Sequence, residues 1–340
     1  MQGFAGRSLK FAVSVGLVLM LSAGAWAQTS YTVTNLVSNL SGKAKHQDTL
    51  LTNPWGIAYG PGLAFWVSDE KSGWSTLYDG KGNPQSLQVV VPPASGTGAG
   101  SPTGIVYNGS SEFQIDTWPS EFMFATLDGT IQGWSHFSPS ASLIAVTTAG
   151  ASYTGLAVTS KSSGNSLFAA DAANNKVDIY DASFNLVKSF TDSTIPAGFA
   201  PFGIQDIGGM LYVTFASTSG GSGGYVDIFK EDGTFVKQLV KGSPLNQPWG
   251  LAIAPSDFGP LSNTLLVTNN AAGGTINGFN TTTGKLVGTI KNSKGKNIVI
   301  NGLWGIVFGG GSSLNGAKNQ LFFTAGPSDT NGYFGMIALN

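Results

Sequence analysis

The sequence predicts an all-β chain folded as a six-bladed β-propeller. A short phrase built around x-Gly-Ile/Leu occurs six times, and its glycines lie 48, 51, 48, 47 and 55 residues apart. A fixed period of this length, filled with strand-like sequence, indicates radial repetition with one blade per repeat. Composition agrees, because the 48 glycines suit tight turns between short strands better than helices. The six repeat glycines are Gly56, Gly104, Gly155, Gly203, Gly250 and Gly305.

Each repeat begins with the phrase itself, which we expect to form the innermost strand. Glycine there lets neighbouring backbones approach closely at a crowded centre, so we expect these positions to accept nothing larger than alanine. Further strands follow as short apolar or alternating runs. They are clearest in the third repeat, at residues 167–171, 177–181 and 186–190.

The sixth repeat lacks a fourth strand. Its runs at residues 305–308, 321–324 and 335–339 reach the end of the chain, while residues 31–37 form an unassigned strand before the first repeat. An open sheet edge favours aggregation, so we expect residues 31–37 to complete the last blade and close the ring.

Residues 1–27 have the three-part layout of a secretory signal peptide. Arg7 and Lys10 precede an apolar run of 11 residues, and Ala25-Trp26-Ala27 offers a cleavage site. The alternative is an uncleaved anchor helix. We expect residues 28–340 to be a single propeller domain, exported to the periplasm or the extracellular space of a bacterium, and monomeric.

Charge and cysteine content exclude several classes of partner. Removing the two basic residues of the signal from 17 basic and 18 acidic residues leaves a net charge of −3. This balance gives no electrostatic footprint for nucleic acid. No apolar run beyond residue 27 is long enough to span a membrane. The chain has no Cys, hence neither disulfides nor thiolate metal ligands.

The repeat pattern resembles NHL-type propellers. With His46-Gln47-Asp48 before the first phrase and Ser68-Asp69-Glu70 after it, the chain more closely resembles an uncharacterised family of exported bacterial six-bladed propellers. Some members of that family carry a C-terminal exosortase sorting signal, which residues 336–340 do not match. The resemblance implies a fold and an exported location, but no reaction.

Polar residues close the second strands of alternate blades. Asp69, Asp171 and Asn269 hold this position in blades one, three and five, and Glu70 follows Asp69. Oxygen ligands converging on the axis would bind a divalent cation, calcium or magnesium; gluconolactonase-like propellers use glutamate, asparagine and aspartate in this way. The alternative is that each side chain accepts hydrogen bonds from its own turn.

The residue before each repeat glycine divides the ring into two arcs. It is aromatic in blades four, five, six and one, and threonine in blades two and three: Phe202, Trp249, Trp304 and Trp55, against Thr103 and Thr154. One interpretation is a wall on which a sugar ring or another small ligand stacks, with amides from Asn53 and Gln247 beside it. The other is packing between blades.

His46 is the candidate general acid or base, because we expect it near a face or the mouth of the ring. A surface or loop-anchoring role is the alternative. The first functional hypothesis is a binding scaffold for a small molecule, glycan or protein. The second is a metal-dependent hydrolase or lyase at the axis, and the third is a structural component of the cell surface.

Overall fold

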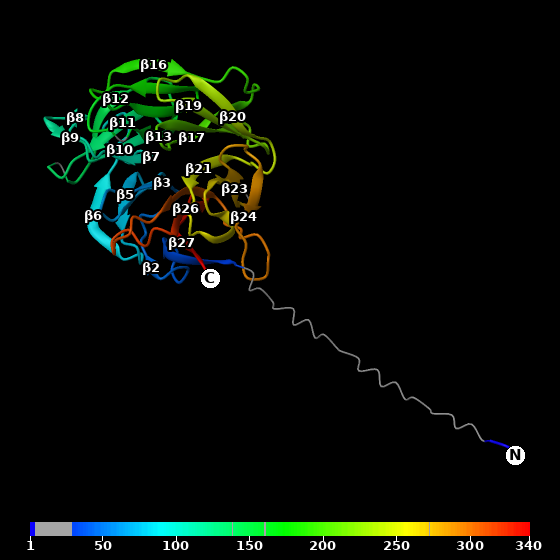
Figure 1. The fold of residues 1–340 in the computed structure, drawn as a ribbon. Helices are drawn as coiled ribbons and strands as arrows, with labels where there is room; N and C mark the ends of the chain where they lie inside the picture. Colours follow the sequence, from blue (N-terminus) through cyan, green and yellow to red (C-terminus); the bar gives the residue numbers. More distant parts are fainter. Residues whose placement is uncertain (4–28, 138, 160, 272) are drawn as a thin grey trace.

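The computed structural model describes residues 1–3, 29–137, 139–159, 161–271 and 273–340. Within these residues the regular elements are strands and one short 3-10 helix, η1 (Gly259–Leu261). The strands form six blades arranged in a ring, which confirms the predicted all-β six-bladed propeller (Figure 1). The predicted signal peptide lies outside the described residues, apart from residues 1–3.

Blades one to three follow one another along the chain, each with its first strand at the centre of the ring. From the centre outward, blade one comprises β3 (Pro54–Ala58), β4 (Phe65–Asp69), β5 (Trp74–Tyr78) and β6 (Pro84–Val90). Blade two comprises β7 (Pro102–Tyr107), β10 (Phe122–Thr126), β11 (Thr130–Trp134) and β12 (Leu143–Thr147). Blade three comprises β13 (Tyr153–Val158), β14 (Leu167–Asp171), β15 (Lys176–Tyr180) and β16 (Leu186–Phe190). Blade two also carries a small hairpin, β8 (Gln114–Ile115) and β9 (Trp118–Pro119), between its first two strands.

Blades four and five repeat the four-stranded order, and blade six combines both ends of the chain. Blade four comprises β17 (Phe199–Asp206), β18 (Met210–Ser217), β19 (Tyr225–Lys230) and β20 (Phe235–Lys241). Blade five comprises β21 (Pro248–Ile253), β22 (Thr264–Asn269), β23 (Ile276–Asn280) and β24 (Leu286–Thr289). Blade six comprises β25 (Leu303–Phe308), β26 (Leu321–Ser328), β27 (Asn331–Leu339), β1 (Tyr31–Ser38) and β2 (His46–Gln47).

Burial within a blade explains the sequence pattern of its strands. Second strands such as β4 and β14 are buried along their whole length, because neighbouring blades cover both of their faces. Their sequences are accordingly almost continuously apolar. The outermost strand β16 is exposed at four of its five residues. The hydrophobic core is therefore divided into clusters between and within blades.

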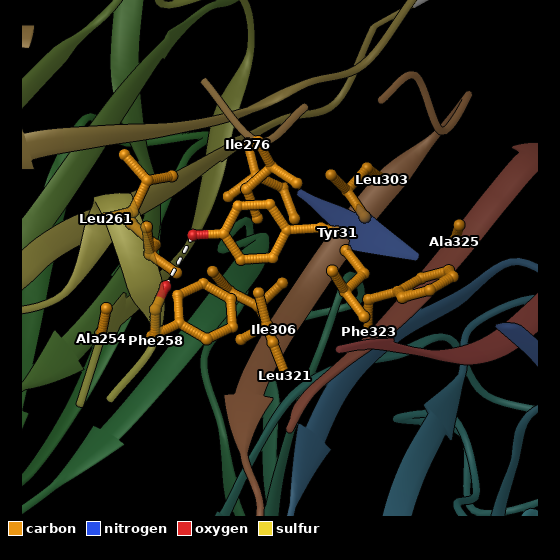
Figure 2. Packing of buried hydrophobic residues seen from close by; sticks show 13 residues of the cluster. Tyr31, Ala254, Phe258, Leu261, Ile276, Leu303, Ile306, Leu321, Phe323 and Ala325 are labelled. Atoms are coloured by element: carbon orange, nitrogen blue, oxygen red, sulfur yellow. Dashed lines mark hydrogen bonds between the residues drawn. The ribbon is translucent and has the colours of Figure 1, made fainter. Parts of the chain in front are cut away.

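The N-terminal strand closes the ring as predicted. β1 pairs antiparallel with β27, from Tyr31 opposite Leu339 to Ser38 opposite Tyr333. Figure 2 shows Tyr31 packed into a buried apolar cluster, with its hydroxyl donating a hydrogen bond of 2.6 Å to the carbonyl oxygen of Phe258. β1 thus completes blade six and also joins it to blade five.

The repeat glycines lie where inner strands of neighbouring blades touch. A Cβ atom added to any of the six would lie less than 3.0 Å from a backbone atom of the next blade. For Gly305 that atom is the carbonyl oxygen of Trp55, so the contacts run round the whole ring. None of the six has a positive φ. Crowding rather than backbone conformation excludes a side chain, and even alanine requires the blades to shift.

Candidate functional site

Three tryptophans fill one end of the channel along the axis. The rings of Trp55 and Trp304 stack with centroids 3.6 Å apart, and Trp249 meets Trp304 edge-on at 5.9 Å. Phe202 comes from blade four, opposite blade one, yet its ring lies 6.0 Å from that of Trp55. Each tryptophan is at most 8% exposed. We call Trp55, Trp249 and Trp304 the tryptophan plug.

Hydrogen bonds hold two of the three indoles of the plug, those of Trp249 and Trp304, whereas the buried indole nitrogen of Trp55 has no partner among the described residues. The indole nitrogen of Trp249 in blade five donates to the carbonyl oxygen of Thr154 in blade three, at 2.9 Å. These two blades are not neighbours, so the indole reaches across the ring. The packing interpretation accounts for all these contacts, although they join side chains across the axis rather than across one interface. Ligand binding by the three rings stays a prediction.

The two candidate amides lie beside the plug in different ways. Asn53 accepts a hydrogen bond from the indole of Trp304 at 3.2 Å and donates to Glu70 at 2.8 Å. Gln247 instead donates to the carbonyl oxygens of Ser217 and Gly221 in blade four. Both residues have positive φ, 44° and 52°. The structure therefore joins Asn53 to the plug, whereas the amide of Gln247 anchors a neighbouring loop.

His46 lies on the outermost strand of blade six. β2 pairs in parallel with β1, with His46 opposite Val37, and three strands separate β2 from the inner strand β25. The structure thus places His46 away from the mouth of the ring, while a position near a face of the ring and a role as general acid or base stay predictions. The cause is the path of the chain, which returns along the outside of β1 before it enters blade one.

Asp171 and Asn269, two of the candidate metal ligands, are held by hydrogen bonds to neighbouring turns and loops. Asp171 accepts from the backbone of Ser152 and from the backbone and side chain of Asn174. Asn269 accepts from the backbone of Asn246 and donates to the carbonyl oxygen of Pro244. The bonds from Asn174 to Asp171 match the turn-anchoring alternative, whereas Asn269 is bonded to the segment that leads into its own blade. Among the described residues, no group of three His, Cys, Asp or Glu side chains has the arrangement to hold a metal ion.

Asp69 is fully buried like Asp171, but it differs from the other candidates because one of its carboxylate oxygens is unpaired among the described residues. One carboxylate oxygen accepts a hydrogen bond of 2.8 Å from Thr76, and the other has no partner among the described residues. Burial raises the pKa of Asp69 well above its usual range, the charge of Asp48 raises it further, and the bond from Thr76 opposes both. A cation bound by Asp69 and Glu70 stays a prediction.

Buried threonines that the sequence analysis missed support the inner strands. Thr268 in β22 accepts a hydrogen bond from the backbone of Gly250 at 2.7 Å and donates to the carbonyl oxygen of Trp304 at 2.8 Å. Thr324 in blade six does the same for Gly305 and Trp55. Blades two and three have alanine at this second-strand position and threonine before the repeat glycine. Threonine thus occupies one of the two positions or the other, and this alternation can be read from the aligned repeats of the sequence.

A wider cavity opens at the opposite end of the axis from the plug. Its narrow part ends at Trp249 and is lined by the residue after each repeat glycine: Ile57, Ile105, Leu156, Ile204, Leu251 and Ile306. Where the inner strands end, it widens to about 650 Å³. The wide part takes one further side chain from every blade, at the third position after the glycine: Tyr59, Tyr107, Val158, Asp206, Ile253 and Phe308. We call this cavity the exit funnel.

The rim of the exit funnel is asymmetric. Its aromatic residues Phe308, Tyr59 and Tyr107 come from the consecutive blades six, one and two, and Asp206 comes from blade four, opposite blade one. Burial raises the pKa of Tyr59. Burial also raises the pKa of Asp206, with a further contribution from Glu231, and the backbone N–H of Gly209 opposes this at 2.9 Å. The funnel can therefore offer an apolar wall and one carboxyl group to a ligand.

Solved structures similar to this chain support the fold alone. The soluble aldose sugar dehydrogenase of Escherichia coli, in its apo form, has a TM-score of 0.60 at 11% identity, covering 91% of this chain and 99% of that one. The gluconolactonase XC5397 of Xanthomonas campestris has a TM-score of 0.55 at 15% identity, covering 86% and 89%. A protein of unknown function from Bacteroides thetaiotaomicron has a TM-score of 0.58 at 12% identity, covering 92% and 77%.

Sequence relatives come from a virus of amoebae. No family model matches the chain. The uncharacterized protein R648 of Acanthamoeba polyphaga mimivirus is 30% identical over 323 residues, which covers 88% of this chain and 78% of that protein. The uncharacterized protein L690 of the same virus is 30% identical over 305 residues, covering 82% and 79%. The bacterial, exported character expected from the sequence stays a prediction. By its sequence, the chain belongs to the family that includes these two mimivirus proteins.

Proposed function

We propose that the protein is an exported binding propeller that holds a small molecule in the exit funnel. One observation carries the proposal: all six blades place two residues of the repeat around a single blind cavity of about 650 Å³. Small-molecule sites typically occupy about 300–1,000 Å³ and are mostly apolar with a few polar groups. The composition of the funnel matches that description.

The lining selects the chemistry of the ligand. Tyr59, Tyr107 and Phe308 suit the flat or apolar face of a molecule. Asp206, on the other side of the rim, suits a hydroxyl or amine that donates a hydrogen bond. A compact molecule with an apolar body and one donor group fits both features. Glycans and protein partners are the other ligand classes that the sequence suggests.

A charge at the rim provides the test. Ile253 is 37% exposed and lines the funnel, so Ile253→Lys should fold and place an ammonium group in the apolar site. Val236 is 40% exposed on the outer strand β20, so Val236→Lys is the matched control. Phenols, lactones and hydroxylated amines are screened by thermal shift, and the hits are measured by calorimetry. We expect Ile253→Lys to weaken binding at least about tenfold and Val236→Lys to leave it unchanged. If a hit binds Ile253→Lys and Val236→Lys equally well, the ligand binds outside the funnel.

The hydrolase hypothesis has its own measurement. The gluconolactonase likeness supplies only a fold, so this hypothesis rests on Asp69 and Glu70, with Asp171 and Asn269 in other blades. Calcium and magnesium are titrated into the protein, and lactone hydrolysis is followed with and without the cation. Cation-dependent hydrolysis that is lost in Glu70→Gln would favour the enzyme over the binding scaffold.

A further inference from the structure

Blade two carries an element that interrupts the repeat. The hairpin β8–β9 pairs only with itself and stands outside the six blade sheets. The other blades form without such a hairpin, so the ring itself does not need it. A segment added to one blade is therefore a candidate for a role in binding. The hairpin and the β11–β12 turn enclose a cavity of about 320 Å³.

The cavity has aromatic walls that reach solvent. Trp118 in β9 is 45% exposed and Phe137 in the β11–β12 turn is 53% exposed. Their rings stack with centroids 3.7 Å apart, and the imidazole of His136 lies 3.9 Å from the ring of Phe137. Trp134 forms a buried part of the wall, where its indole donates to the carbonyl oxygen of Pro139 at 3.1 Å. The walls therefore combine a fixed base with two aromatic rings accessible from outside.

Backbone geometry holds the hairpin in this position. Asp116 and Thr117 at its tip have φ values of 52° and 80°, a conformation that side-chain-bearing residues rarely adopt. A Cβ atom at Gly133 of β11 would collide with the side chain of Ser120 and lie 2.7 Å from Ile115. Glycine thus lets the hairpin lie directly against β11. Positive φ at both central residues is the usual geometry of a two-residue hairpin turn, so the tight turn and the contact with Gly133 together set the position of the hairpin.

Polar groups are placed among the rings. Asp116 and Ser135 line the cavity, and the buried hydroxyl of Ser120, which also lines it, has no hydrogen-bond partner among the described residues. None of the described lining residues is Lys or Arg, so the walls have no cation to recognise an anionic ligand. The cavity offers aromatic faces, hydroxyl groups and one carboxylate.

We propose that this cavity is a saccharide-binding site, separate from the exit funnel. A pyranose ring has an apolar C–H face that packs on an aromatic ring and an edge of hydroxyl groups that donate to a carboxylate and exchange hydrogen bonds with serine. This matches the combination of Trp118 and Phe137 with Asp116 and Ser135. The volume suits one or two sugar rings, with the rest of a glycan outside.

Calorimetry with defined sugars tests the proposal. The probes are glucose, N-acetylglucosamine and the β-1,4-linked tetramer of each, titrated into the purified protein. We expect at least one tetramer to bind, with Trp118→Ala weakening it at least about tenfold and Asp116→Asn weakening it several-fold. The matched control is Phe235→Ala, because Phe235 is a 43% exposed aromatic on the outer strand β20.

Each other outcome overturns the assignment. If none of the four sugars binds to wild-type protein that circular dichroism shows to be folded, the cavity is not a saccharide site. Binding that survives Trp118→Ala, or that falls equally in Phe235→Ala, places the sugar elsewhere. Competition by an exit-funnel ligand, or loss in Ile253→Lys, would merge the two sites. Trp118→Ala does not alter the exit funnel, and Ile253→Lys does not alter the hairpin cavity. Failure of the saccharide proposal therefore leaves the proposed function standing.

Discussion

Asp227 is a buried carboxyl group that the fold keeps without a hydrogen-bond partner. It lies in β19, fully buried, and among the described residues neither oxygen has a bond of normal geometry. Burial, followed by the nearby carboxyl of Asp192, raises its pKa to about 8, and Gln238 acts in the opposite direction. A partly charged carboxylate in this position destabilises the protein at alkaline pH.

The sign of the resulting pH dependence follows from the two pKa values. Unfolded Asp titrates near pH 4, so between about pH 4 and pH 8 the native chain holds a proton that the unfolded chain has lost. The contribution of Asp227 to stability is complete below about pH 4 and is lost as pH rises through about 8. Asp227→Asn should therefore exceed wild type by a few kcal/mol at pH 9 and match it near pH 4.5.

Denaturant unfolding at several pH values measures this difference. Asp181→Asn is the control, because hydrogen bonds from Asn185 and Ser183 outweigh partial burial and lower the pKa of the half-buried Asp181. That variant should gain nothing at pH 9. Equal alkaline destabilisation of wild type and Asp227→Asn would show that Asp227 titrates normally.

Gly250 tests the crowding at the centre of the ring. A Cβ atom there would lie 2.5 Å from the carbonyl oxygen of Trp304 and 3.0 Å from the hydroxyl of Thr268. Gly250→Ala should cost about 1–3 kcal/mol in unfolding free energy, because inner strands must separate. Gly109→Ala, where the nearest atom is 3.4 Å away, should stay within about 0.5 kcal/mol of wild type. Equal stabilities for the two variants would contradict the close approach.

At the scale of the element, β1 stabilises the protein through two kinds of contact. Its backbone pairs with β27 along the edge of blade six, and Tyr31 packs against blade five. Burial raises the pKa of Tyr31 to about 12, so its hydroxyl stays protonated and donates to Phe258 throughout the neutral range. Without β1, the edge of β27 and an apolar cluster would be exposed to solvent.

A protein that begins at Leu40 should therefore be much less stable than one that begins at Gln28. We expect a loss of at least about 3 kcal/mol, or aggregation through the exposed edge. Tyr31→Phe removes only the hydrogen bond to a buried carbonyl and should cost about 1–3 kcal/mol. Both are measured by chemical unfolding. If the protein that begins at Leu40 unfolds at the same denaturant concentration as the longer one, ring closure by β1 contributes nothing.

For the whole molecule, the ring makes the two ends of the channel different. The inner strands all begin at the tryptophan plug and all end at the exit funnel. Repeat sequences therefore place equivalent residues at equivalent heights along the axis, and differences between repeats become asymmetry around it.

Within the described residues no helix has the length and apolar character to span a membrane.

Export is the prediction that concerns the chain as a whole. The signal layout of residues 1–27 implies cleavage after Ala27, which leaves Gln28 as the first residue. Intact-mass spectrometry of the protein recovered outside the cytoplasm should give the mass of residues 28–340. A mass that includes residues 1–27 would favour the uncleaved anchor.

The amino-acid sequence alone determines the blade number, the strand order and the closing strand. These features follow from local patterns: a glycine every 47 to 55 residues, alternating apolar runs, and a sixth repeat that is one strand short. The turn in which Asn174 donates to Asp171 is local in the same sense. Each can be recognised from short stretches of the sequence, even where the strands that pair lie at opposite ends of the chain, so a single sequence is enough to predict it.

Only the tertiary structure decides what lies at the axis. Trp55, Trp249 and Trp304 are far apart in sequence, and whether their rings line an open channel or meet in its centre depends on the radius of the closed ring and the tilt of its strands. The same geometry makes the third position after each glycine, from Tyr59 to Phe308, the rim of one cavity. It also sends His46 to the outer edge, because β2 pairs with β1 after the ring has closed. Strand patterns specify which residues are buried, but the closure of six blades determines which of them meet.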